Sequence, residues 1–108
     1  MRVFALKTCD TCRKALRELR AAGYQPQVVD VRADGVSAAD LAGFLREFGA
    51  ELVNRRSATW RGLDAAARAG DPLALLQAHP TLMKRPVIEH DGRLFLGWGE
   101  ETRAALLG

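Results

Sequence analysis

The sequence has few cysteine, histidine and tyrosine residues, which are common in catalytic and metal-binding sites. Its 108 residues include two cysteines, two histidines and one tyrosine. No apolar run approaches the roughly 20 residues needed to cross a bilayer, and the first residues lack the apolar length of a secretory signal. We therefore expect a cytoplasmic protein with no membrane partner. The 16 basic and 13 acidic residues are spread along the chain rather than gathered in a tail, so direct nucleic-acid binding is not predicted.

The composition is sufficient for one hydrophobic core. With 48% hydrophobic residues over 108 positions, we predict a single domain, residues 1–108. A short apolar run at 2–6 predicts a strand, and the run at 27–31 predicts a second strand. Between them a helical pattern begins at about residue 11, with Gly23 at the position of a C-terminal cap. These opening residues form one β-α-β unit, which is normally parallel.

In the rest of the chain the period of the hydrophobic pattern changes twice. Residues 37–79 carry helical patterns and are long enough for a few helices. They also contain helix start signals, among them Ser37 with Asp40 and the pair Asp71-Pro72. Alternating runs on either side of 90–92 then predict a β-hairpin, followed by a closing helix. The order β-α-β, helices, β-β-α is that of an α/β, thioredoxin-like fold with a helical insertion at about 37–79.

The stretch "KTCDTCRKA", residues 7–15, places Cys9 and Cys12 three positions apart at a helix entrance. A metal site would have to recruit His79 and His90, whose spacing fits no zinc finger, and both are expected to be solvated loop residues, so no metal is predicted. A structural bridge is a poor alternative, because so short a loop removes little unfolded-state entropy and the cytosol is reducing.

A redox pair has a direct physical basis. At a helix entrance the unpaired backbone N–H groups and the positive end of the helix dipole stabilise a thiolate, which lowers the pKa of Cys9. Cys12, one turn further on, is near enough to attack a mixed disulfide formed at Cys9. Basic neighbours such as Lys7, Arg13 and Lys14 are expected to favour the anion further.

Other residues have both a functional and a structural interpretation. Arg55 and Arg56 could form an anion-binding arm or be solvated, and the bond before Pro86 could be cis. Trp60 fits core packing better than a ligand cleft, whereas Trp98, between two glycines, remains a candidate for lining a cleft.

Four segments, "CDTCRKALREL", "LVNRRSATWRGLD", "HPTLMKRPVI" and "RLFLGW", together resemble the arsenate reductase and Spx family of thioredoxin-fold proteins. The resemblance implies that Cys9 is the reactive cysteine and that Arg56 and Arg85 bind an oxyanion or a carboxylate. It also implies that Pro86 is cis and faces the thiol. Two guanidinium groups near a thiolate would lower its pKa and hold an anion in a fork geometry.

Departures from the family pattern indicate a branch. Where arsenate reductases of the family carry a Gly-Arg-Pro segment, this chain has Gly97-Trp98-Gly99, and it has Cys12 in addition. Cys12 and the aromatic Trp98 resemble the Spx branch, but the best match in length is to members that resemble glutathione-dependent thiol reductases, which share the aromatic. We therefore expect a thiol-disulfide oxidoreductase with no bound cofactor and with glutathione as co-substrate. The alternatives are an arsenate reductase using glutathione and glutaredoxin, and an Spx-like redox-switched regulator that binds the RNA polymerase α-subunit.

Overall fold

The computed structural model describes residues 1–108 as two compact units. The sheet unit consists of Met1–Asp30 and Arg85–Gly108, and the helical unit is Val31–Lys84. None of the helices is both long enough and apolar enough to cross a membrane. The organisation of the whole chain as a single domain stays a prediction.

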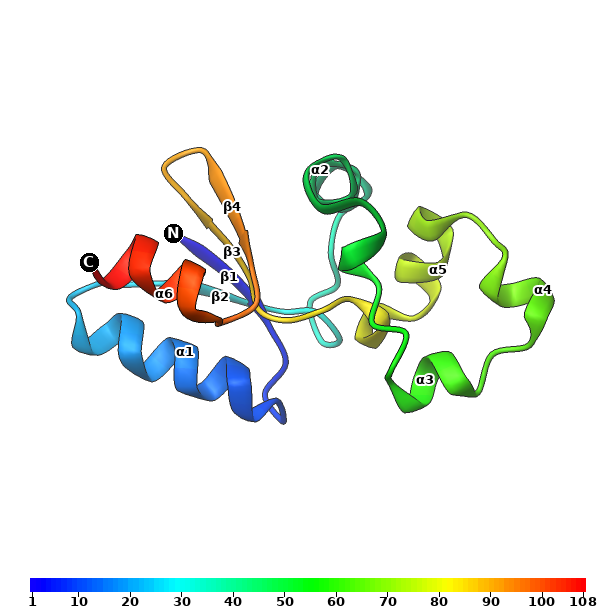
Figure 1. The fold of residues 1–108 in the computed structure, drawn as a ribbon, viewed down its shortest axis with the longest axis horizontal. Helices are drawn as coiled ribbons and strands as arrows, with labels where there is room; N and C mark the ends of the chain where they lie inside the picture. Colours follow the sequence, from blue (N-terminus) through cyan, green and yellow to red (C-terminus); the bar gives the residue numbers. More distant parts are fainter. The chain divides into compact units, whose positions relative to one another are not determined.

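The sheet unit has the predicted β-α-β and β-β-α order. Its four strands are arranged β2-β1-β3-β4, with β1 parallel to β2 and antiparallel to β3, and with β3 antiparallel to β4. Helices α1 and α6 cover the same face of this sheet (Figure 1). The elements are β1 (Arg2–Ala5), α1 (Asp10–Ala21), β2 (Gln27–Asp30), β3 (Val87–His90), β4 (Arg93–Leu96) and α6 (Glu100–Leu107).

One hydrophobic cluster joins the sheet to its two helices. Because side chains alternate along a strand, Val3 and Ala5 point to the same face. They pack there with residues of α1, β3, α6 and the segment between β4 and α6: Cys12, Ala15, Leu19, Ile88, Trp98 and Leu106. The core of the sheet unit therefore lies directly beneath the predicted redox pair, and one of the two cysteines belongs to it.

Local signals place the ends of α1 and of the hairpin as predicted. Gly23 has φ +97°, and the N–H groups of Gly23 and Tyr24 donate to the carbonyls of Arg20 and Leu19 at 3.1 Å, which is a Schellman C-cap. In the hairpin, Asp91 and Gly92 have φ of 50° and 75°, as a type I′ turn requires.

His90 does not lie at the tip of the turn, contrary to the sequence prediction. It is the last residue of β3, where it pairs with Arg93, and its ring packs edge-on against Tyr24 with centroids 5.3 Å apart. The two-residue turn is the cause, since it leaves position 90 inside the ladder.

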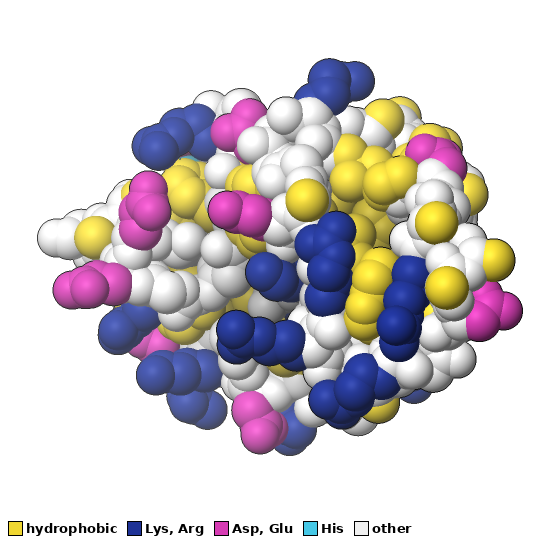
Figure 2. Space-filling model, turned by 45° about the vertical axis from the view of Figure 1, so that its right-hand side comes forward, with side chains coloured by type: hydrophobic (Ala, Val, Ile, Leu, Met, Phe, Trp, Pro, Cys, Tyr) yellow, Lys and Arg dark blue, Asp and Glu magenta, His cyan; other side chains and the backbone are white.

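The surface carries both signs of charge. In Figure 2 dark blue Lys and Arg side chains and magenta Asp and Glu side chains are both scattered over the face that is drawn, with apolar side chains between them. This agrees with the spread of charge along the sequence.

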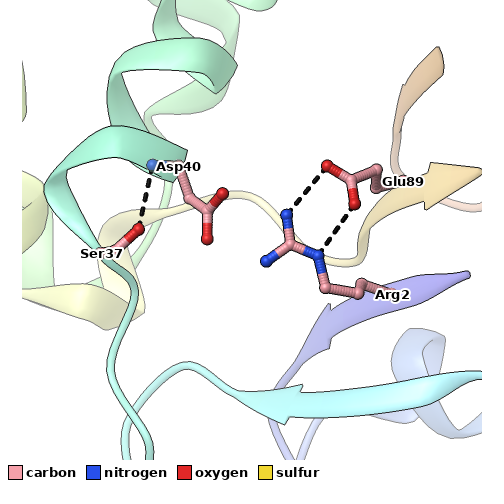
Figure 3. Close-up of polar contacts among 4 residues, drawn as sticks. All are labelled: Arg2, Ser37, Asp40 and Glu89. Atoms are coloured by element: carbon pink, nitrogen blue, oxygen red, sulfur yellow. Dashed lines mark hydrogen bonds and ion pairs between the residues drawn. The ribbon is translucent and has the colours of Figure 1, made fainter. Parts of the chain in front are cut away.

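On the sheet face opposite to α1 and α6, a cross-strand ion pair links β1 to β3. The guanidinium of Arg2 donates to both carboxylate oxygens of Glu89 at 2.9 Å (Figure 3), and it also lies 4.9 Å from the centre of the Phe4 ring. The fork geometry fixes the register of the two strands.

The first helix of the helical unit begins directly after the predicted capping residue. The Ser37 hydroxyl accepts the Asp40 N–H at 3.1 Å (Figure 3), and the carboxylate of Asp71 accepts the Ala74 N–H at 3.3 Å at the start of the helix whose first residue is Pro72. The elements are α2 (Ala38–Phe48), η1 (Gly49–Leu52), α3 (Ala58–Arg61), α4 (Ala65–Arg68), α5 (Pro72–Ala78) and η2 (Pro80–Leu82).

Candidate functional site: a cysteine pair at the entrance of α1

Cys9 is the N-cap of α1, as the sequence predicts. Its backbone is extended, with φ −88° and ψ 116°, and its carbonyl accepts the Arg13 N–H at 3.0 Å. Its own N–H donates to the Leu6 carbonyl at 3.0 Å, which closes the turn between β1 and α1. The thiol therefore sits where the first N–H groups of the helix lack partners within the helix.

The surroundings of Cys9 favour its thiolate. Partial burial raises the pKa of the Cys9 thiol, but the backbone N–H and the thiol of Cys12, together with the guanidinium of Arg85, outweigh this effect and lower the pKa below its ordinary value. Since the thiolate is the nucleophilic form of cysteine, this position is suited to attack on sulfur.

Cys12 lies in the opposite kind of environment. It is 1% exposed in the core of the sheet unit, and both cysteines are free thiols in this structure. Burial, together with the nearby Cys9 thiolate, raises the pKa of Cys12 to about 12. At neutral pH Cys12 therefore keeps its proton and can donate it in a hydrogen bond to Cys9.

The basic residues expected to favour the anion are not the ones that act on Cys9. Arg13 forms an exposed ion pair with Asp10 at 3.0 Å, which takes up its charge, and the side chains of Lys7 and Lys14 point into solvent. The cation that acts on the thiol is Arg85, which is 76 positions further along the chain. Proximity in sequence was the wrong guide here, because the sheet brings the start of β3 next to the end of β1.

Arg85 and Pro86 lie at the end of the sheet where Cys9 is. Phe4 in β1 pairs with Val87 in β3 and the two strands are antiparallel, so the residues before Val87 lie at the end of β1 that leads into the turn carrying Cys9. The bond between Arg85 and Pro86 is cis, as the family resemblance implies. The Pro86 carbonyl accepts the Gly97 N–H at 2.8 Å, which holds the segment after β4 at the same end.

Trp98 is buried rather than open to a cleft. Its side chain packs in the same cluster as Cys12, with 8% of the residue exposed, and its indole N–H donates to a carboxylate oxygen of Glu18 at 3.0 Å. The other oxygen of Glu18 accepts from Arg103 at 2.8 Å. Hydrogen bonding from Trp98, then from Arg103, lowers the pKa of Glu18. This placement favours a packing role for Trp98 over contact with substrate.

The remaining predicted site residues belong to the helical unit. Arg56 is exposed, and its backbone N–H donates to the side chain of Asn54 at 3.0 Å. Trp60 is only partly buried, contrary to the core position expected for it, and the guanidinium groups of Arg55 and Arg68 lie 5.5 and 5.6 Å from its ring centre. Helix α3 has four residues, which is too short to bury a tryptophan on one face.

The helical unit also contains an open cavity that the sequence did not indicate. Its volume is about 320 Å³, and it lies between α2, η1 and α5. Its lining is mainly apolar and includes no cysteine: Leu45, Gly49, Ala50, Val53, Arg55, Asp71 and Pro72.

Comparison with known proteins matches this arrangement to one family. The family model described as ArsC matches residues 4–106. The chain belongs to the ArsC family. An uncharacterised protein of Haemophilus influenzae is 38% identical over an alignment of 108 positions, which covers 95% of this chain and 95% of that protein.

Solved structures of ArsC-family relatives share the fold. A protein named YFFB is 32% identical, with 99% of this chain and 98% of that chain covered and a TM-score of 0.89. An arsenate reductase (ArsC) related protein from Brucella melitensis is 33% identical, with 96% and 91% covered and a TM-score of 0.73. The predicted thioredoxin-like fold is thereby confirmed. Membership in the ArsC family supports a thiol-based oxidoreductase in general.

The link from Glu18 to Trp98 and Arg103 could not be predicted from the sequence. No local signal points to it, because the partners are 80 and 85 positions apart. The one available hint is general: a buried tryptophan usually finds an acceptor for its N–H.

Proposed function

We propose that this ArsC-family protein is a glutathione-dependent thiol-disulfide oxidoreductase with Cys9 as its nucleophile. The observation that carries the proposal is the position of Cys9 at the N-cap of α1, where Arg85 and the first turn of the helix stabilise its thiolate. A surface thiol with a lowered pKa is the usual requirement for attack on a disulfide.

The proposed reaction has two exchange steps. The Cys9 thiolate attacks the glutathione sulfur of a mixed disulfide, and the substrate leaves as a thiolate that takes up a proton. A second glutathione, as thiolate, then attacks the glutathione sulfur bound to Cys9. Glutathione disulfide leaves and the Cys9 thiolate is restored, so that one mixed disulfide and one glutathione give one free substrate thiol and one glutathione disulfide.

Arg85 has two roles in this scheme. Its charge keeps Cys9 ionised before the attack, and its guanidinium can pair with a carboxylate of glutathione. For Arg56 a role in anion binding stays a prediction, drawn from the family resemblance. An Arg56→Ala variant that keeps its kcat but loses affinity for glutathione would support that role.

The test is steady-state reduction of a glutathione mixed disulfide with glutathione and glutathione reductase, run beside Cys9→Ser and Cys12→Ser. We expect turnover to vanish in Cys9→Ser and to persist in Cys12→Ser, the signature of a monothiol enzyme. Loss in both variants would indicate that Cys12 resolves the intermediate. Full activity in Cys9→Ser would refute the proposal.

Arsenate reduction is the second candidate, because one structural relative is described as related to arsenate reductase. The position at which arsenate reductases of the family carry an arginine holds buried Trp98, so the oxyanion would have one cation fewer. Arsenate turnover with glutathione and glutaredoxin would favour this candidate. If the protein turns over neither substrate, and if it retains the RNA polymerase α-subunit in a redox-dependent manner, the Spx-like regulator would be favoured instead.

A further inference from the structure

The solvent-facing side of α1 is strongly basic. The buried side of the helix carries Cys12, Ala15 and Leu19, and its exposed side carries four basic side chains within eight positions: Arg13, Lys14, Arg17 and Arg20. Arg13 is paired with Asp10, so we call the other three, Lys14, Arg17 and Arg20, the basic row. The basic row begins five positions after the reactive cysteine.

The acidic residues of α1 do not neutralise the basic row. Asp10 is paired with Arg13 at 3.0 Å. Glu18 is held by the Trp98 indole and by Arg103, and Lys14 reaches it only through a longer-range charge interaction. Lys14, Arg17 and Arg20 form no ion pair in the structure. Their charges therefore remain available to a partner in solution.

The length of the basic row indicates the size of that partner. With a rise of about 1.5 Å per residue, Lys14 lies about 8 Å and Arg20 about 16 Å along the helix from Cys9. An extended peptide needs about five residues to cover 16 Å. The row thus matches a polypeptide segment that carries acidic side chains within about five positions of its own cysteine.

The first turn of α6 has the opposite sign. Glu100 and Glu101 are exposed there, and α6 lies beside α1 on the same face of the sheet (Figure 1). An acidic partner is repelled from this turn and attracted to the basic row. Complementary charge of this kind sets orientation and encounter rate more than affinity.

We infer that the basic row is a docking surface for acidic polypeptides whose cysteine, flanked by acidic residues, carries the disulfide that Cys9 attacks. The inference rests on the proposed function and adds its substrate class. The chemistry is the exchange described above, with the glutathionylated cysteine of the polypeptide as the substrate sulfur.

The test uses three glutathionylated peptides that differ only in the four residues after the cysteine, which are all Glu, all Gln or all Lys. At an ionic strength of about 0.01 M we expect kcat/KM for the Glu peptide to exceed that for the Lys peptide by at least about tenfold, with the Gln peptide between them. The advantage should shrink at about 0.15 M, where the Debye length falls to about 8 Å. Equal rates for the three peptides at low salt would overturn the inference.

Two variants with the same change in net charge locate the effect. Arg17→Glu should reduce the ratio of the Glu peptide to the Gln peptide, whereas Arg93→Glu should leave it unchanged. Arg93 is a suitable control because it is exposed in the same unit and lies beside the hairpin turn, at the other end of the strands from Cys9. An equal reduction in both variants would refute a local docking surface.

A neutral disulfide and a binding measurement separate this inference from the proposed function. Turnover of 2-hydroxyethyl disulfide by the wild type tests the exchange chemistry alone. Fluorescence anisotropy with the same three peptides, with serine in place of cysteine, tests docking without chemistry. Preferred binding of the Glu peptide would support docking at the basic row even if the protein reduces none of the disulfides. Equal binding of the three peptides would refute docking at the basic row even if the protein reduces all three mixed disulfides.

Discussion

The buried thiol of Cys12 predicts a specific loss of stability in alkali. Its pKa rises from 9.0 to about 12 because the side chain is buried and lies beside the Cys9 thiolate. The folded state therefore holds this proton more tightly than the unfolded chain does. The stabilisation is complete below about pH 9 and is lost as the pH rises toward 12. At 1.36 kcal/mol per unit, a pH of about 11 should lower the free energy of unfolding by roughly 2 to 3 kcal/mol.

Urea denaturation under reducing conditions measures this loss at about pH 8 and about pH 11. Other groups also titrate in this range, so the quantity to compare is the difference between the wild type and Cys12→Ala, which cannot ionise at this position. Cys9→Ala is the control: it removes the contribution of the Cys9 thiolate to the raised pKa of Cys12 but leaves burial, the largest cause, so a reduced alkaline loss should remain. Parallel losses in the wild type and Cys12→Ala would refute the reasoning.

Three further predictions concern the neighbours of the cysteine pair. Arg85→Met should raise the pKa of Cys9, so that the pH profile of its alkylation by iodoacetamide moves toward alkali, and an unchanged profile would contradict the role given to Arg85. Trp98→Phe should lower the melting temperature while KM for the disulfide stays within about twofold, because the indole packs in the core; a large rise in KM would restore Trp98 as a substrate contact. Leu19→Ala, at a fully buried position, should cost about 2 to 5 kcal/mol in urea denaturation, and a cost below about 1 kcal/mol would show that the core is not packed as described.

The features that the sequence predicted well are those that depend on neighbouring residues. Ser37 caps α2 and Asp71 caps α5 because a short polar side chain reaches an N–H three positions on. Gly23 and Gly92 end an element because each adopts a positive φ that other residues avoid. Such signals need no knowledge of the rest of the chain.

The features that the sequence missed depend on pairing across the fold. Lys7 and Lys14 lie close to Cys9 in sequence, yet Arg85 is the cation that lowers its pKa, because β3 pairs with β1. Charge in a short stretch cannot reveal such a partner, and only the family resemblance pointed to it. Trp60 was misjudged for a related reason, since a tryptophan on a single short turn is stacked by arginines instead of being buried.

The unlike environments of the two cysteines bear on how the intermediate is resolved. Once Cys9 carries glutathione its negative charge is gone, which removes one cause of the raised pKa of Cys12. The charge of Arg85 continues to lower the pKa of Cys12. Burial, the largest cause, remains. Cys12 therefore becomes a better nucleophile in the intermediate but still has to give up a proton from within the core. A glutathione thiolate arriving from solvent faces no such cost, so resolution by glutathione should be faster, and Cys12 contributes chiefly by donating a hydrogen bond to the Cys9 thiolate. Cys12→Ser should therefore keep turnover, because a serine hydroxyl can donate the same hydrogen bond to Cys9. Cys12→Ala removes this hydrogen bond and should raise the pKa of Cys9.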